Sequence, residues 1–180
     1  MNAANPRENK KDSIIEAALQ VFSQKGYHAA TMSEIAVAAG IGKGTIYEYF
    51  DSKLQLFQAM MEKGLQLYYS NVTTESMASL TIEERLKFLI EVHVHFCREN
   101  SQLTRIVLWD TQIMDEELRD WMYSLRKEKE KRLQDLFDEA IQRGEIRSID
   151  TYLAALLVEG VNSSMGGPLV LEAWDVDAPT

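Results

Sequence analysis

Residues 31 to 53 constrain the fold of this chain more than any other stretch, because their pattern predicts two short helices joined by a tight turn. Thr31 and Glu34 have the spacing of a capping box, in which each side chain binds a backbone amide at the start of a helix. Gly40 follows, and glycine readily takes the left-handed conformation that ends a helix. A second helix is predicted over residues 42 to 50. Two short helices around a glycine turn form a helix-turn-helix.

The outward face of the predicted second helix carries groups that suit contact with a nucleic acid. Lys43, Gly44, Thr45, Tyr47 and Tyr49 are expected on this face. Hydroxyl groups and the amides at a helix start bind phosphate, and a glycine permits close approach of a duplex. Catalysis requires other groups, so the pattern favours DNA binding over an enzymatic role.

The same stretch resembles the signature of the tetracycline-repressor (TetR/AcrR) family of transcription regulators. That signature is a helix, a T-x-x-x-I-A-x-x-A-G turn, the motif G-T-x-Y-x-Y/H-F and a following lysine, and the likeness covers about residues 12 to 57. It includes the preceding helix and the turn at residues 25–27 that ends it. Two positions depart from the family pattern. Gly42 replaces a serine that is common in the turn, and Glu48 stands where a neutral or basic residue is frequent.

The resemblance implies a set of DNA contacts at the matching positions of the motif. The predicted contacts are Thr31, Ser33, Lys43, Gly44, Thr45, Tyr47, Tyr49 and Lys53. Lys43 and Gly44 are placed to reach base edges, where a lysine can pair with guanine O6 or N7. Thr45, the two tyrosines and Lys53 are expected to bind phosphates. The alternative is that the tyrosines only pack the small domain.

Composition and periodicity predict an all-α fold. Only three prolines occur, all near the ends, and no alternating run is long enough to predict a sheet. With the resemblance, the predicted domains are an N-terminal three-helix helix-turn-helix domain at residues 1–56 and a C-terminal helical ligand-binding and dimerisation domain at residues 57–180. No apolar run reaches the ~18 residues that span a bilayer, and the polar start lacks a signal-peptide core. Cys97 is the single cysteine, so a cytoplasmic protein is expected.

The distribution of charge agrees with DNA binding through the N-terminal end. The net charge of the 180 residues is −9, which by itself is unusual for a nucleic-acid-binding protein. Residues 1 to 60 are neutral, with six basic and six acidic side chains, so the remaining 120 residues carry the whole deficit. An acidic body is repelled by DNA, which favours docking through the N-terminal part.

The C-terminal part is predicted to be a series of helices with large, adaptable side chains. A second capping box, Thr81 with Glu84, begins one helix, and Gly144 is expected to end another. The resemblance implies an effector cavity among these helices. Its predicted lining is Phe88, His93, Phe96, Arg105, Trp109, Gln112, Trp121 and Met122. Core packing is the alternative for each residue, and both a lipophilic cation and an acyl chain stay open as ligands.

Two polar clusters have simple interpretations. The charged run at residues 126–132 is predicted to be the solvated face of a helix. His93 and Cys97 share a helix face, but His95 lies about 200° from His93 around the axis. Two ligands do not make a metal site, so neither a metal nor another cofactor is expected.

The last helical pattern has an apolar stripe at intervals of three and four residues. Together with the resemblance, it predicts a dimer interface at Tyr152, Leu153, Leu156, Leu157, Gly160 and Val161. Ordinary core packing is again the alternative. Only twelve residues follow Pro168, so the second long helix of a four-helix dimer interface is expected to be missing or reduced to residues 169–174.

The sequence therefore predicts a homodimeric transcription regulator that recognises a palindromic DNA site. The resemblance implies a repressor that a small lipophilic effector releases, by displacing the helix that runs from residue 53 to about residue 69. The alternative is a regulator of the same fold that a protein partner controls without a small effector. No Ser-His-Asp order, paired carboxylates or phosphate loop supports an enzyme.

Overall fold

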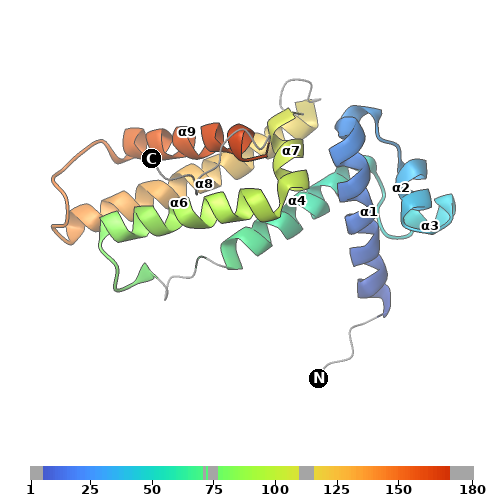
Figure 1. Ribbon diagram of the computed structural model, residues 1–180, viewed down its shortest axis with the longest axis horizontal. Coiled ribbons are helices and arrows are strands. Elements are labelled where there is room, and N and C mark those ends of the chain that lie inside the picture. Colours follow the sequence, from blue (N-terminus) through green and yellow to red (C-terminus); the bar gives the residue numbers. More distant parts are fainter. Residues whose placement is uncertain (1–5, 71, 73–76, 110–115, 171–180) are drawn as a thin grey trace. The chain divides into compact units, whose positions relative to one another are not determined.

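The computed structural model describes residues 6–70, 72, 77–109 and 116–170, which form α-helices and contain no strand. The helices of these ranges, in chain order, are α1 (Pro6–Ala29), α2 (Met32–Ala38), α3 (Lys43–Tyr47), α4 (Lys53–Ser70), α6 (Ile82–Glu99), α7 (Ser101–Trp109), α8 (Glu116–Gln142) and α9 (Thr151–Val170) (Figure 1). The predicted all-α fold is confirmed.

Contacts divide the chain into two units. The N-terminal unit is Met1–Leu67 together with Gln102–Gln112, and the C-terminal unit is Tyr68–Ser101 together with Ile113–Thr180. The division falls inside α4, and α7 groups with the N-terminal helices, which the sequence did not predict. The functional boundary after residue 56 stays a prediction.

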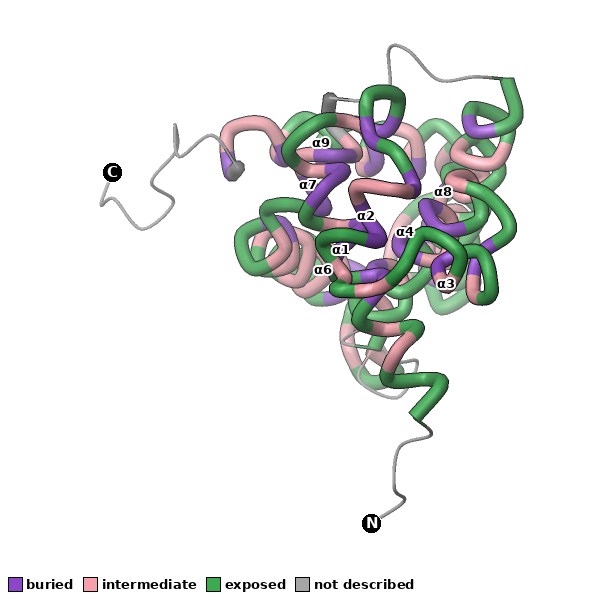
Figure 2. Tube along the Cα trace, turned by 90° about the vertical axis from the view of Figure 1, so that its right-hand side faces the viewer, coloured by how far each residue is buried: buried purple, intermediate pink, exposed green. Residues whose placement is uncertain are grey.

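An aromatic cluster holds the N-terminal unit together. Helix α1 buries Ile14, Ala18 and Phe22, which recur every four residues and so line one face of the helix. The rings of Tyr27 and Phe57 lie 5.8 and 5.4 Å from that of Phe22 and 5.0 Å from each other. Such ring pairs add stabilisation beyond the buried apolar area. Buried and exposed stretches alternate along the helices, as amphipathic packing requires (Figure 2).

Two glycines shape the ends of the first two helices. Gly26 has a φ of 77° and breaks α1 before its last turn, and Gly40 has a φ of 65° after α2. Side chains rarely adopt such values, so both turns need glycine. The capping box at the start of α2 is present in both directions, between Thr31 and Glu34. The predicted helix start and both turns are confirmed.

The C-terminal unit consists mainly of α6, α8 and α9, which run side by side (Figure 1). One core cluster is Ile82, Phe137 and Ala140, with half-buried apolar residues of α8 and α9 around it. The buried Arg85 of α6 donates to the Leu80 carbonyl and pairs with a Glu139 oxygen at 3.1 Å. The predicted capping box of α6 and the glycine end of α8, where Gly144 has a φ of 73°, are confirmed.

The long helix that packs against α9 is α8, which precedes it in the chain. Helices α8 and α9 pack against each other and form a pair of long helices among the described residues. The expectation that the second long helix of a four-helix dimer interface is missing or reduced after Pro168 stays a prediction. Of the segment 169–174, residues 171–174 lie outside the described residues. Within the described ranges, no helix is long and apolar enough to cross a membrane.

Candidate DNA-binding and effector sites

The helix-turn-helix exposes the surface that the sequence assigned to DNA. Ile46 is fully buried and anchors α3, whereas Lys43, Gly44 and Tyr47 are exposed and Thr45 is half-buried. Gly42 begins α3 without a side-chain cap. Helix α3 has only five residues, shorter than the predicted two turns, because the chain turns at residues 48–50 through bonds to the carbonyls of Thr45 and Ile46.

The predicted contacts on α2 are partly engaged within the protein. The Thr31 hydroxyl donates to Glu34 Oε2 at 2.9 Å and accepts from the Glu34 amide. Lys25 donates to the same carboxylate at 2.6 Å, and this bond is the main reason that the pKa of Glu34 lies below its ordinary value. Ser33 is half-buried. Thr31 therefore serves first as the cap that begins α2.

Lys53, which the sequence predicted as a phosphate contact, has a structural role within the protein. Its ammonium group donates to the carbonyls of Tyr27, His28 and Ala30 at 2.6, 3.2 and 3.1 Å, and it lies 4.5 Å from the centre of the Tyr27 ring. An ammonium group has three protons, and these three carbonyls accept them all. A cation here also complements the negative end of α1. Lys53 therefore caps the end of α1, and its predicted phosphate contact stays a prediction.

We expect Lys53→Met to lower the free energy of unfolding by about 2 kcal/mol, because three carbonyls at the end of α1 lose a charged donor. The measurement is urea unfolding followed by circular dichroism. Lys43→Met is the matched control: it removes the same charge from an exposed position and is expected to change stability by less than about 0.5 kcal/mol. Equal stability of the two variants would contradict the capping role.

The sequence analysis missed two cations that lie beside the helix-turn-helix. The Arg7 guanidinium lies 5.9 Å from the centre of the Tyr49 ring, and Lys11 Nζ lies 5.6 Å from the centre of the Phe50 ring. With Glu8 they border a surface hollow of about 270 Å³. Their spacing of four residues at the start of α1 was the available signal. They add positive charge beside Tyr49 and Phe50.

A cavity of about 350 Å³ lies within the C-terminal unit. Its walls are mainly aromatic and aliphatic, with two cations of α8 and one amide of α9 among them. The described lining is Tyr68, Tyr69, Val72, Met77, Leu89, Lys129, Arg132, Leu133, Leu136 and Asn162. A mainly apolar hollow with a few polar groups is the usual form of a small-molecule site.

The polar side of this cavity contains buried groups. Lys129 Nζ lies 3.1 and 2.9 Å from the two carboxylate oxygens of Glu159, which is 7% exposed. Asn162 is 3% exposed, and its side-chain oxygen has no hydrogen-bond partner among the described residues. His93 Nε2 lies 3.0 Å from the Asn162 carbonyl, which can only accept, so Nε2 donates this bond. Burial lowers the pKa of His93.

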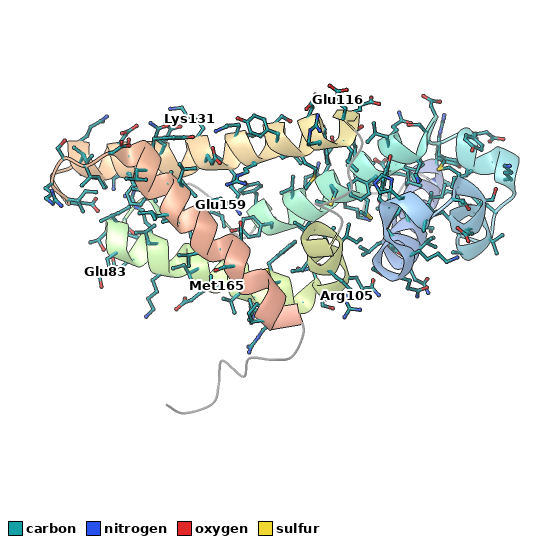
Figure 3. The ribbon with its side chains drawn as sticks, turned by 90° about the horizontal axis from the view of Figure 1, so that it is seen from above. Glu83, Arg105, Glu116, Lys131, Glu159 and Met165 are labelled. Atoms are coloured by element: carbon teal, nitrogen blue, oxygen red, sulfur yellow. The ribbon has the colours of Figure 1, made fainter. Side chains whose placement is uncertain are left out.

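The residues predicted to line an effector cavity occupy several places. His93 and Phe96 are not in the described lining of the cavity. Their rings pack against the ring of Tyr68, which does line it, with ring centres 6.2 and 5.2 Å away. Phe88, Trp121 and Met122 are half-buried in the C-terminal unit. Arg105, labelled in Figure 3, is on α7 of the N-terminal unit. It borders a hollow that Phe22 and Gly26 also line. The Trp109 side chain and Gln112 lie outside the described residues.

The charged run of α8 is not a fully solvated face. Glu130 is 4% exposed and accepts bonds from Arg126 and Lys127, of which the Lys127 bond is the main cause of its lowered pKa. Lys129 points into the unit, as its place in the cavity wall shows. No group of three or more His, Cys, Asp or Glu side chains in the described ranges is arranged to hold a metal ion.

Helix α9 presents an uncovered apolar face. Leu153, Leu157 and Val161 are 53, 64 and 51% exposed, and they lie one helical turn apart. A Cβ atom added at Gly160 would meet nothing within 4 Å. The predicted Tyr152 is also exposed, and Leu156 is half-buried. Large aliphatic side chains on one face are typical of a surface that a partner covers.

Comparison with known proteins identifies the class. Residues 14–60 match the family model of bacterial regulatory proteins of the tetR family, and residues 79–166 match the tetracyclin repressor-like C-terminal domain. The chain is 33% identical over 102 residues to the transcriptional activator FasR of Mycolicibacterium smegmatis, a match covering 57% of this chain and 47% of FasR. The chain thus spans about half the length of that relative.

Two solved structures resemble this chain over more than nine-tenths of its length. The fatty acid degradation regulator FadR from Bacillus halodurans has a TM-score of 0.83 and 27% identity, covering 96% of this chain and 88% of that one. The transcriptional regulator FadR from Bacillus subtilis, in complex with stearoyl-CoA, has a TM-score of 0.81 and 28% identity, covering 92% of this chain and 90% of that one. The fold and its helix-turn-helix define a DNA-binding transcription regulator, not an enzyme. The chain belongs to the tetR family.

Proposed function

We propose that the protein is a homodimeric repressor that binds a palindromic operator and is released by a long-chain acyl-CoA. The observation that carries this proposal is the likeness, over 92% of the chain, to a FadR that holds stearoyl-CoA. The mainly apolar cavity of the C-terminal unit supports it, since an acyl chain needs apolar walls. A regulator controlled only by a protein partner has no need of such a hollow. Binding to chromosomal DNA implies a cytoplasmic location.

The proposed DNA surface is the exposed face of the helix-turn-helix. It comprises Lys43, Gly44, Thr45, Tyr47 and Tyr49, with Ser33 and Thr31 at its edge. Two copies of α3 in a dimer reach successive major grooves if they lie ~34–36 Å apart. The uncovered face of α9 is the proposed dimer contact, and it includes Gly160, where a partner backbone can approach closely.

Helix α4 is the proposed connection between the effector and the operator. Its first residue, Lys53, caps the end of α1, and its residues Tyr68 and Tyr69 line the cavity. The helix is continuous from Lys53 to Ser70, so a ligand that moves its end also moves its start. A coupling of ~1–3 kcal/mol, or ~5–150-fold in operator affinity, is enough for such a switch.

The experiment is selection of genomic fragments by the purified protein at near-physiological salt, with and without stearoyl-CoA. We expect an enriched palindrome in the absence of stearoyl-CoA and a loss of enrichment in its presence. Salt is held constant, because it controls non-specific binding. An enriched palindrome that stearoyl-CoA and shorter acyl-CoAs leave unchanged would contradict the effector assignment while retaining the DNA assignment.

A further inference from the structure

We propose that Lys129 is the effector's anion contact and that Glu159 competes with the effector for it. The inference rests on the proposed function, because it takes the cavity of the C-terminal unit as the effector site. The two carboxylate oxygens of Glu159 lie 3.1 and 2.9 Å from the Lys129 ammonium group. This ion pair joins α8 to α9, and Figure 3 labels Glu159 half-way along α9.

The cavity selects an anionic effector with an apolar body. Lys129 and Arg132 lie one turn apart on α8 and both line the cavity. Arg132 is held by Glu128 at 2.6 Å and stacks on the Tyr69 ring at 4.4 Å. The described lining includes Lys129 and Arg132 but not their carboxylate partners, so a lipophilic cation would meet like charges in the wall and is disfavoured. A chain that ends in a carboxylate or phosphate matches both parts of the wall.

The buried side-chain amide of Asn162 is a further polar group in the cavity wall that a ligand can bind. Asn162 lines the cavity beside these cations, is 3% exposed, and has a side-chain oxygen without a partner among the described residues. Buried polar atoms normally have a partner, so a ligand atom belongs here. A turn of the amide by 180° offers its NH₂ group instead, which donates to an anionic oxygen.

Competition for Lys129 gives the effector a way to act on α9. Glu159 is 7% exposed, and the Ser163 hydroxyl also donates to its carboxylate, at 3.5 Å. A buried carboxylate that loses its cation is strongly disfavoured. When an effector oxygen binds Lys129, the Glu159 carboxylate must therefore move to reach water. This movement alters α9, the helix that carries the uncovered apolar face.

The test compares two variants of the full chain by calorimetric titration with decanoate, decanol and decanoyl-CoA. Glu159→Gln removes the competitor and keeps its size, so decanoate affinity is expected to rise by roughly tenfold while decanol affinity stays the same. The double variant Lys129→Met with Glu159→Gln removes both charges and leaves no lone buried ion. It is expected to bind decanoate no better than decanol. Thermal melting checks that both variants fold.

A purely structural ion pair would behave differently, because Glu159→Gln would then weaken or leave unchanged the binding of every probe. That result, or a double variant that still prefers decanoate, would overturn the proposal. Tight decanoyl-CoA binding that the double variant loses, with weak decanoate binding, would assign the anionic group to the CoA phosphates. Equal wild-type affinity for decanoate and decanol would overturn the ion-pair inference alone. Absence of binding by all three probes would overturn this inference, and the proposed effector would fall with it only if stearoyl-CoA also failed to bind.

Discussion

A variant with Leu153→Glu and Leu157→Glu is expected to be monomeric and to bind the operator at least ~100-fold more weakly than the wild type. Both leucines are more than half exposed on the uncovered face of α9, at 53 and 64%. Charges at the centre of an apolar interface oppose association, because they must lose their water without gaining partners. A dimer binds two half-sites together, and this linkage is worth ~10²–10⁴-fold in affinity.

Sedimentation velocity and operator titration measure the two effects of this variant. The control is Leu67→Glu, which adds the same type of charge at a leucine of α4 that is 50% exposed. It is expected to remain dimeric. Gly160→Arg gives a second version of the test, since an added side chain meets nothing in the single chain. A double-leucine variant that stays dimeric would place the interface elsewhere.

The second large effect is expected from Gly44→Glu in α3. A Cβ atom at this position meets nothing within 4 Å in the protein, and glycine is a poor helix former. The fold therefore tolerates the change, and the melting temperature is expected to stay the same or rise. Operator affinity is expected to fall at least ~100-fold, because the new carboxylate stands where the DNA must approach and repels its phosphates.

Fluorescence anisotropy with the selected operator at fixed salt measures this loss. The matched control is Gln66→Glu, which adds the same charge at an exposed position of α4. Its operator affinity is expected to stay within about twofold of the wild type. If Gly44→Glu binds as well as Gln66→Glu, α3 does not approach DNA through this face, and the proposed contact surface is wrong.

Local signals made the N-terminal unit predictable. The capping box of Thr31 and Glu34 and the turns at Gly26 and Gly40 depend on neighbouring residues, and the structure confirms each of them. Lys53 shows the limit of such reasoning. Its three carbonyl partners are 23 to 26 residues away in the chain, so only the tertiary fold reveals that it caps α1.

The effector cavity was less predictable, because it depends on how helices pack. The large aromatic residues of α6 were expected to line it, but the described cavity takes Tyr68 and Tyr69 from the end of α4. Lys129 and Arg132 belong to a charged run that indicated a solvated face. Neither the pairing of Lys129 with Glu159 nor their burial follows from helical periodicity, since the two residues are 30 positions apart.

The measurement that most directly tests an acyl-CoA-controlled operator switch is a reciprocal titration at one salt concentration. Stearoyl-CoA affinity is measured for the free protein and for the protein saturated with operator, and operator affinity is measured with and without stearoyl-CoA. Thermodynamic linkage requires the two ratios to be equal. We predict equal ratios between ~5 and ~150, with each ligand weakening the other. Ratios of one, with both ligands bound, would contradict the switch.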